Sequence, residues 1–280
     1  MHLTLLLAAL TVAGLLRLQP IDPNQNWQER WWRLLGLFLF SPLLLLATAI
    51  ALVWMGPRGQ MVRWWEGWFS YSLALLFLVF AVFWAIKLAG EGWRSLRRVR
   101  KYPQWELKGT SARLLPTPIP FVARVGFWRS ELVISQGLLQ AFDADHLNAV
   151  LTHEQAHHYY RDTFWFFWLG WLRRLTFWLP QTETLWQELL LLREHRADCW
   201  AAQSVDSLLL AESLVQMVSA PALYSEIASA AFSNALPHNR LEERIEVLLS
   251  QPKPLQQIGL WVWAWLLSGF LPLLVAPFHY

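Results

Sequence analysis

The chain has 280 residues, of which 55% are hydrophobic and 15% charged, with a net charge of +3 and a mean hydropathy of +0.28. This composition excludes an intrinsically disordered chain and is too apolar for ordinary soluble domains. A single cysteine, Cys199, excludes an intrachain disulfide and a cysteine-rich zinc finger. Any metal must therefore be held by histidines and carboxylates. The chain also has 20 tryptophans, which are typical of membrane interfaces, so the composition predicts a membrane protein.

Four apolar stretches are candidates for membrane-spanning helices, at about residues 1–18, 34–55, 67–88 and 254–280. The last three contain runs of about 20 uncharged residues, the length that crosses a bilayer as a helix. The first is shorter and ends at Arg17, so a signal peptide is the alternative, although a basic start and a small-residue cleavage site are lacking. Tryptophans suited to interfacial anchoring flank the second and third stretches: Trp27, Trp31, Trp32, Trp64, Trp65 and Trp68.

Basic residues are concentrated after the third stretch. The segment contains Arg94, Arg97, Arg98, Arg100, Lys101, Lys108 and Arg113. Because Lys and Arg are retained on the cytoplasmic side, we expect residues 91–253 to be cytoplasmic and both termini to lie outside. A basic run can also bind nucleic acid, but beside a membrane helix we expect contacts with anionic lipid and no direct nucleic-acid partner.

The body at 91–253 is predicted to begin with a short β-hairpin and to continue with helices. Strands are expected at 121–125 and 131–135, around Gly126, with prolines limiting one edge. Helices are expected from Asp143 or Asp145 to about Tyr160, and from Thr182 to about Gln203. Two further helices are expected at 204–219 and 241–249.

Segment 163–180 is rich in Trp and Phe, but its uncharged run ends after ten residues at Arg173 and Arg174. That run is too short to span a bilayer. We expect the segment to be interfacial or re-entrant, with four tryptophans in the bilayer: Trp165, Trp168, Trp171 and Trp178.

The sequence His153-Glu154-Gln155-Ala156-His157 has the HExxH pattern and falls on the first predicted helix of the body. Two histidines four positions apart project from nearly the same face of a helix, so both imidazoles can bind one Zn²⁺. Glu154 lies beside the first of them. A carboxylate there can accept a proton from the attacking water and pass one to the leaving amine of a peptide. The alternative is a solvated helix in which these residues occur together by chance.

A catalytic zinc site needs a third protein ligand and an open position for water. The candidates lie in Leu192-Arg193-Glu194-His195-Arg196-Ala197-Asp198. Glu194 is preferred, because it completes a His₂Glu set and its i, i+4 spacing puts Asp198 on the same face, where it can hydrogen-bond a zinc-binding imidazole. His195, about 100° around the helix, is the alternative ligand. Asp162 supports the site in the same way as Asp198 or forms a surface salt bridge.

Together these motifs resemble the membrane gluzincins, which include the HtpX and CAAX-prenyl-protease group and the BlaR/MecR antirepressor group. The resemblance rests on HExxH followed by an ExxxD helix, on the hairpin with its Leu-Val-Ile-Ser strand, and on His-Asn-Arg-Leu-Glu-Glu-Arg-Ile at 238–245. Three spans before the body and one after it are similar to the BlaR/MecR type. The resemblance implies zinc binding by His153, His157 and Glu194, Glu154 as the base, Asp198 behind the ligands, and His238 or Arg244 near the substrate oxyanion.

The resemblance also implies a mainly α-helical integral-membrane protein with about four transmembrane helices and a cytoplasmic, zincin-like α+β domain that contains a small sheet. It implies one Zn²⁺ per chain and hydrolysis of a cytoplasmic or membrane-proximal protein, such as a transcriptional repressor, at a bacterial plasma membrane. HtpX-like quality control of membrane proteins and a non-enzymatic scaffold that retains zinc are the alternatives. β-Lactam sensing is not expected, because the chain ends at Tyr280 without the sensor domain of the antibiotic receptors.

The strand at 131–135 is expected to be an edge strand. An extended substrate peptide can add to such an edge through backbone hydrogen bonds, which would place its scissile bond near the zinc. The alternative is a hairpin that only supports the active-site helix.

Overall fold

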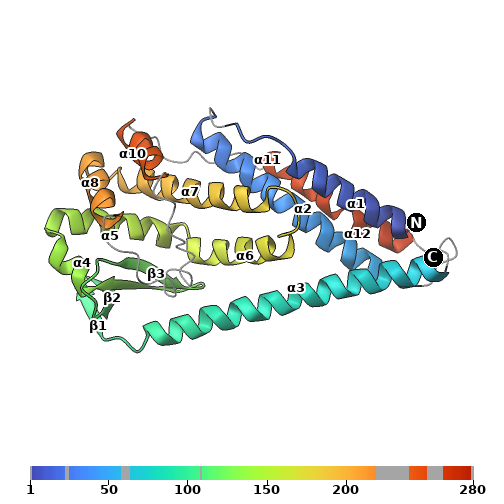
Figure 1. Ribbon diagram of the computed structural model, residues 1–280, viewed down its shortest axis with the longest axis horizontal. Coiled ribbons are helices and arrows are strands. Elements are labelled where there is room, and N and C mark those ends of the chain that lie inside the picture. The colour runs from blue at the N-terminus through green and yellow to red at the C-terminus, as the bar shows by residue number, and fades with distance from the viewer. Residues whose placement is uncertain are drawn as a thin grey trace. The chain divides into compact units, whose positions relative to one another are not determined.

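The computed structural model describes residues 2–22, 25–57, 64–107, 109–218, 240–250 and 261–278. Within these residues the chain is mostly helical and contains a four-stranded sheet (Figure 1). It divides into two compact units: Met1–Lys87, Leu169–Leu189 and Gln256–Tyr280 form the first, and Leu88–Trp168 and Leu190–Leu255 form the second. The boundaries fall inside the helices α3 (Trp64–Val99), α6 (Asp162–Leu175) and α7 (Thr182–Ala201), so neither unit is a continuous stretch of sequence.

The first unit is built around α2 (Trp27–Met55). The helix α1 (His2–Arg17) packs along it, with Ala13 and Phe40 in one buried cluster. Four short segments end the described chain: α11 (Trp261–Ala264), η2 (Trp265–Phe270), α12 (Leu271–Val275) and η3 (Ala276–Phe278). The Trp265 ring stacks on Phe40 at a centroid distance of 5.1 Å. An added Cβ at Gly36 would lie 2.6 Å from the same ring, so this close approach requires glycine.

Arg17, the last residue of α1, is buried and binds the middle of α2. Pro42 lies inside α2 and has no N–H, which leaves the Phe38 carbonyl without its helical partner. Arg17 Nη2 donates to that carbonyl at 3.0 Å, and Arg17 Nε donates to Ser41 Oγ at 3.3 Å. A buried cation is costly unless its donors are used. Here Arg17 satisfies the acceptor that Pro42 leaves open.

We expect Arg17→Met to lower the free energy of unfolding of the detergent-purified protein by about 1–3 kcal/mol, because the Phe38 carbonyl is then buried without a donor. Pro42→Ala restores the N–H that this carbonyl lacks, so the same substitution should cost less in the Pro42→Ala background. A double-mutant cycle on the free energies of unfolding measures the difference. Equal losses in the two backgrounds would contradict this role of Arg17.

Two helices in the described part of the chain are long and apolar enough to cross a membrane, by length and composition. They are Trp27–Met55, whose apolar window is 72% buried, and Trp65–Val99, whose window is 17% buried. The prediction of four spans is not supported. α1 has only 16 residues, and residues 261–278 are divided into four short segments, with Pro272 in the first turn of α12. Residues 251–260, where the fourth span was expected to begin, lie outside the described part.

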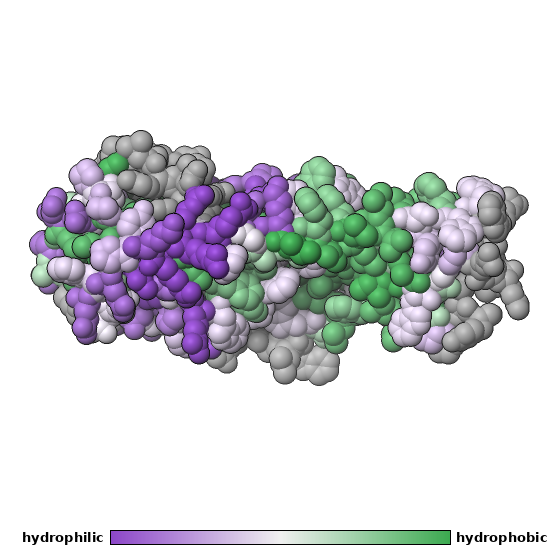
Figure 2. All heavy atoms as spheres, turned by 90° about the horizontal axis from the view of Figure 1, so that it is seen from below, coloured by the Kyte–Doolittle hydropathy of each residue, from purple (hydrophilic) through white to green (hydrophobic). Residues whose placement is uncertain are grey.

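The apolar part of α3 in the first unit is mostly exposed. Val79, Val82, Phe83 and Ile86 are between 55% and 68% exposed, and Figure 2 shows apolar side chains gathered on the face of this unit that contains α3. Soluble monomers rarely expose a contiguous apolar surface of this extent. The helix continues without a break into the basic segment and ends at Val99.

The second unit contains a mixed sheet of four strands. They are β1 (Gln104–Leu107), β2 (Thr110–Leu115), β3 (Val122–Gly126) and β4 (Ser130–Ser135), in the order β1-β2-β4-β3. β3 and β4 form the predicted hairpin. The prediction of an edge strand at 131–135 is wrong, because β2 pairs in parallel with the other side of β4. The edge strand of the hairpin is β3. β1 and β2 lie in and after the basic segment, where charge obscures the alternation that marks a strand.

Alternation along β4 determines what covers each face of the sheet. Leu132 and Ile134 pack in one cluster with residues of α4 (Gln136–Ala141) and α5 (Ala144–Tyr159). Val133 faces the opposite side and packs in a cluster with Val99, the last residue of α3. In the register of the hairpin, Arg124 of β3 lies opposite Leu132. The Arg124 side chain is therefore on the face that α5 covers.

Four helices of the body, α5, α7, α8 (Ser207–Val218) and α10 (Leu241–Leu249), agree with the predicted ones, whereas α4 was not predicted. α5 begins after Asp143, whose carboxylate accepts hydrogen bonds from the N–H groups of Asp145 and His146 at 3.1 and 2.9 Å. One buried cluster contains a residue from each of these four helices: Ala149, Ala201, Leu210 and Leu248. This cluster packs α5, α7 and α10 together, and these helices carry the predicted site.

Segment 163–180 consists of most of α6 and the turn before α7. Three of its four tryptophans are exposed, Trp165 by 57%, Trp168 by 38% and Trp178 by 48%. Trp171 instead donates its indole N–H to the Ala81 carbonyl of α3 at 2.8 Å, within the first unit. An interfacial or re-entrant position of this segment stays a prediction.

Candidate metal centre

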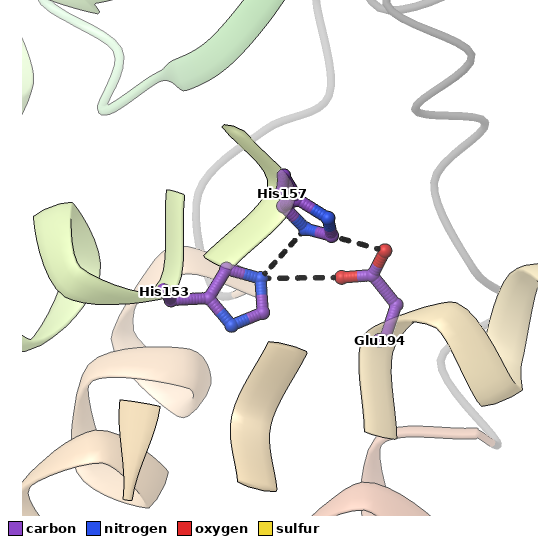
Figure 3. Close-up of side chains that lie close together, drawn as sticks. All are labelled: His153, His157 and Glu194. Carbon is purple, nitrogen blue, oxygen red and sulfur yellow. Dashed lines mark hydrogen bonds and ion pairs between the residues drawn. The ribbon is translucent and has the colours of Figure 1, made fainter. Parts of the chain in front are cut away.

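The two histidines of the HExxH pattern face each other on α5. Their side chains are only 9% and 12% exposed, and the Nε2 atoms of His153 and His157 are 3.1 Å apart (Figure 3). The i, i+4 spacing produces this arrangement, since residues four apart lie on the same face of a helix, one turn apart.

α7 brings Glu194 to the same point. Its Oε2 lies 3.4 Å from His153 Nε2, and its Oε1 lies 3.7 Å from His157 Nε2. Ligand atoms of the three residues all lie within 4.8 Å of one another. Two nitrogens bound to a tetrahedral zinc are about 3.3 Å apart, so the donor set fits this metal. The alternative ligand, His195, points elsewhere, with Nε2 3.7 Å from Glu243 Oε1.

A carboxylate lies against the other ring nitrogen of each imidazole. Asp198 Oδ1 is 2.8 Å from His153 Nδ1, and Asp162 Oδ2 is 2.7 Å from His157 Nδ1. When the imidazoles are neutral, a proton held on each Nδ1 leaves each Nε2 as an acceptor directed toward Glu194. Two imidazole nitrogens and a carboxylate that converge in this way suit a metal cation. Asp162 is only 3% exposed, so its interpretation as a surface salt bridge is wrong.

Three arginines bind the carboxylates of the cluster. Arg244 on α10 holds Asp198 with two bonds, from Nε at 2.8 Å and from Nη2 at 2.9 Å, and its Nη2 is also 3.6 Å from Glu194 Oε2. Arg193 Nε donates to Glu194 Oε1 at 2.9 Å. Arg196 forms an ion pair with Asp162. The structure thus joins Arg244 to Asp198, while His238 lies outside the described residues.

The charges of the cluster shift its pKa values in opposite directions. Burial by itself would lower the pKa of His153, but the carboxylates of Asp198 and Glu194 outweigh it and raise this pKa to about 10. Burial would raise the pKa of Asp198, but Arg244 and His153 lower it to about 2. Arg193 and His157 similarly hold the pKa of Glu194 well below its usual value, against the effect of burial. Both carboxylates are therefore ionised at neutral pH.

Glu154 follows His153 directly in α5 and is only 8% exposed. β3 is tied to the same turn of α5, because Arg124 Nε donates to the Glu154 backbone carbonyl at 2.7 Å. The Glu154 carboxylate also interacts electrostatically with Arg124 and Arg244. Because Arg244 also contacts Glu194 and Asp198, these electrostatic interactions connect the Glu154 carboxylate to the surroundings of the three clustered residues.

The structural roles of Arg124, Arg193 and Arg196 were not predicted from the sequence. The sequence pattern could have predicted two of these roles. Arg193 and Arg196 lie among buried residues of α7, and a buried arginine requires an acidic partner. Arg124 had a weaker signal. It is the inward-facing residue of an otherwise apolar strand, which marks a local inconsistency of the kind found at functional sites.

The model of the Peptidase family M48 matches residues 121–219. No curated protein and no solved structure matches the chain. The matched range begins just before β3, ends just after α8, and contains His153, His157 and Glu194. This similarity of residues 121–219 to Peptidase family M48 supports a zincin-type metallopeptidase.

Proposed function

We propose that this protein is a membrane-embedded zinc endopeptidase that hydrolyses peptide bonds of a cytoplasmic or membrane-proximal protein. The observation that carries the proposal is the convergence of the two Nε2 atoms and the Glu194 carboxylate. Glu154, buried and next to His153 in the same helix, is the proposed base. The ligands would be His153, His157 and Glu194, with one zinc ion per chain. The Peptidase family M48 match over the same residues supports it.

Zinc in a site of this kind supplies Lewis-acid polarisation of the scissile carbonyl and activation of a water molecule. The protein's own groups perform the remaining steps. Glu154 accepts a proton from the attacking water and delivers a proton to the leaving amine. Asp198 and Asp162 hold the imidazoles with Nε2 turned toward the cluster.

We propose that substrate docks on the free edge of β3. Ser135 N–H donates to the Phe121 carbonyl at 2.9 Å, which makes these residues a hydrogen-bonded pair. Such pairs alternate along an antiparallel ladder. Backbone groups of Val122, Arg124 and Gly126 therefore point away from β4, and among the described residues no strand pairs with them. An extended peptide on this edge would lie next to the turn of α5 that carries Glu154.

Membrane embedding is supported by α3. Its apolar part is long enough to span a bilayer and is mostly exposed. Basic residues follow in the same helix, at Arg94, Arg97 and Arg98, which favours a cytoplasmic position for this end and therefore for the peptidase domain. We propose a multi-pass protein of a bacterial plasma membrane.

We further propose that the cleavage is regulatory, with a substrate such as a transcriptional repressor, as in the BlaR/MecR type. HtpX-like quality control is the alternative. Cells that carry Glu154→Gln separate the two uses by quantitative proteomics. Accumulation of one intact regulator supports the first use, and a broad rise in damaged membrane proteins supports the second.

A non-enzymatic scaffold that retains zinc for folding is a candidate from another class. The position of Glu154 favours an enzyme, because a structural zinc site has no need of a carboxylate beside its ligands. The test is hydrolysis of an unfolded, fluorescently labelled polypeptide by the zinc-loaded, detergent-purified chain. We expect cleavage that a chelator stops and added zinc restores. The scaffold hypothesis would be favoured if the purified protein cleaved nothing and if cells that carry Glu154→Gln behaved like cells that carry the wild-type protein.

We propose that Arg244 positions the site through Asp198. Lysine cannot hold a carboxylate with two bonds, so we expect Arg244→Lys to weaken zinc binding by about 10–100-fold. Competition with a chelator measures the affinity, and Arg240→Lys on the adjacent turn is the matched control. For a positioning role, kcat at saturating zinc should stay close to wild type. A large loss of kcat at saturating zinc would support the other role, near the substrate oxyanion.

A further inference from the structure

Arg124 is a cation in a row of apolar side chains. On the sheet face that α5 covers, it lies next to Leu132 of β4, and Val122 precedes it on the same face of β3. It is half-buried, and its side chain reaches the backbone of Glu154 rather than solvent. A residue of this kind is expected where a charge has a use, since an apolar side chain would pack better at this position.

The guanidinium of Arg124 is held in place but is not neutralised. Its Nε donates to the Glu154 carbonyl at 2.7 Å. No carboxylate of the described residues lies within ion-pair distance of it. Arg124 interacts electrostatically with the Glu154 carboxylate and with His158, whose pKa is lowered first by burial and then by Arg124 and Arg161. Arg161, the other cation near His158, has its guanidinium over the Trp128 ring at 3.9 Å.

The region next to the proposed docking edge therefore contains the cation of Arg124, with Glu154 as the acidic group that interacts with it electrostatically. The bond from Nε to the Glu154 carbonyl orients the guanidinium, and its other two nitrogens, Nη1 and Nη2, can donate hydrogen bonds to a ligand. A planar pair of N–H donors with a formal charge matches a carboxylate.

We propose that Arg124 binds a carboxylate of the substrate and so gives the peptidase a preference for an acidic group beside the scissile bond. The inference rests on the proposed function and names a specificity determinant of its site. In a peptide added to β3, the residue directly opposite Arg124 has its side chain on the same face of the sheet. An Asp or Glu at that residue, or the carboxylate of a chain end, is within reach of the guanidinium.

An inward-facing charge has another known use, which is to prevent an edge strand from pairing with a second copy of the chain. That use requires a charge but no particular orientation. The bond from Arg124 Nε to the Glu154 carbonyl fixes the guanidinium at the turn that carries the base, which favours recognition. Arg124→Gln separates the roles, because glutamine keeps a donor for the Glu154 carbonyl and loses the charge.

The test measures binding separately from cleavage. Dansyl-labelled decapeptides of Ala and Leu carry a single Glu or Gln at each position in turn, as free acids and as C-terminal amides. Fluorescence anisotropy gives their affinity for the zinc-loaded Glu154→Gln full-length protein in detergent. We expect one position at which Glu binds about tenfold tighter than Gln, which corresponds to a single charge-assisted contact. If amidation of the C-terminus weakens binding and the change from Glu to Gln does not, Arg124 binds the carboxylate of the chain end.

The same ratio is measured after adding Arg124→Gln and, as the matched control, Arg129→Gln. Arg129 is an exposed arginine on the turn of the same hairpin, so this control removes an equal charge. Arg124→Gln should bring the preference to about one, and Arg129→Gln should leave it unchanged. The proposal would be overturned if the parent protein had no preference for Glu over Gln, or if Arg124→Gln left that preference intact. Self-association of the Arg124→Gln protein, together with an unchanged preference, would show that Arg124 protects the strand edge instead.

Cleavage of the same peptides by protein with Glu154 intact keeps the two failures apart. Arg124-dependent binding without any cleavage would support the inference and overturn the proposed peptidase function. Cleavage with no preference for Glu would support the peptidase function and overturn the inference.

Discussion

Replacing Glu154 by glutamine is expected to lower kcat for hydrolysis of an unfolded polypeptide by about 10²–10⁴-fold, the contribution typical of a positioned general acid or base. Glutamine has nearly the same shape but cannot accept the proton of the attacking water. Glu154 is not among the three clustered ligands, so zinc content should stay at one per chain. A fluorescence assay of cleavage measures kcat, and elemental analysis of the same protein preparation measures the zinc content per chain.

The matched control for this substitution is Glu212→Gln. Glu212 lies on α8, its side chain is 57% exposed, and its contact is with His146 at 3.4 Å rather than with the cluster. This variant should cleave at the rate of the wild-type protein. A Glu154→Gln protein that retains zinc and the wild-type rate would remove Glu154 from the mechanism and leave the scaffold as the better explanation.

Loss of the third ligand should abolish stable metal binding. We expect Glu194→Ala to weaken zinc binding by more than about 100-fold, because residues that merely support a ligand already contribute 10–100-fold. His195→Ala removes the neighbouring buried side chain, whose Nε2 is directed at Glu243, and should keep one zinc per chain. Zinc per folded chain, determined after purification without chelators, separates the two residues. Retention of zinc by Glu194→Ala and its loss from His195→Ala would reverse the assignment.

The same site predicts the direction of the pH dependence of zinc binding. Without metal, Asp198 and Glu194 raise the pKa of His153 to about 10 against the effect of burial, and the pKa of His157 is also raised. Without metal, His153 is therefore protonated at neutral pH, and zinc must displace its proton. Each displaced proton should cost about tenfold in affinity per unit of pH lowered. Chelator competition between pH 6 and 9 checks the slope, and an affinity independent of pH would contradict these pKa shifts.

Several elements of the fold followed from local patterns in the sequence. The capping carboxylate of Asp143 predicts the start of α5, and two strand-like runs around Gly126 predict the hairpin of β3 and β4. The HExxH spacing predicts two imidazoles on one face, and they are 3.1 Å apart at Nε2. Each of these features depends on residues within a few positions of one another, because the helical and strand periods act over that range.

Two predictions failed or found no support because they depended on distant partners. β4 was expected to be an edge strand, but β2 pairs with its other side, and nothing within residues 130–135 specifies that partner. Four apolar stretches indicated four spans. Of the described helices, two are long and apolar enough to cross a membrane, because α1 has only 16 residues and residues 261–278 form several short segments.

The sequence by itself determined the chemistry of the candidate centre: two histidines and a glutamate on one helix, an ExxxD pair on another, and no cysteine set for a metal. Only the tertiary structure decided that Glu194 rather than His195 faces the imidazoles, that Asp162 is buried on His157, and that Arg244 holds Asp198. The physical reason is that a helical period fixes which residues share a face, whereas the packing of α5, α7 and α10 fixes which faces meet.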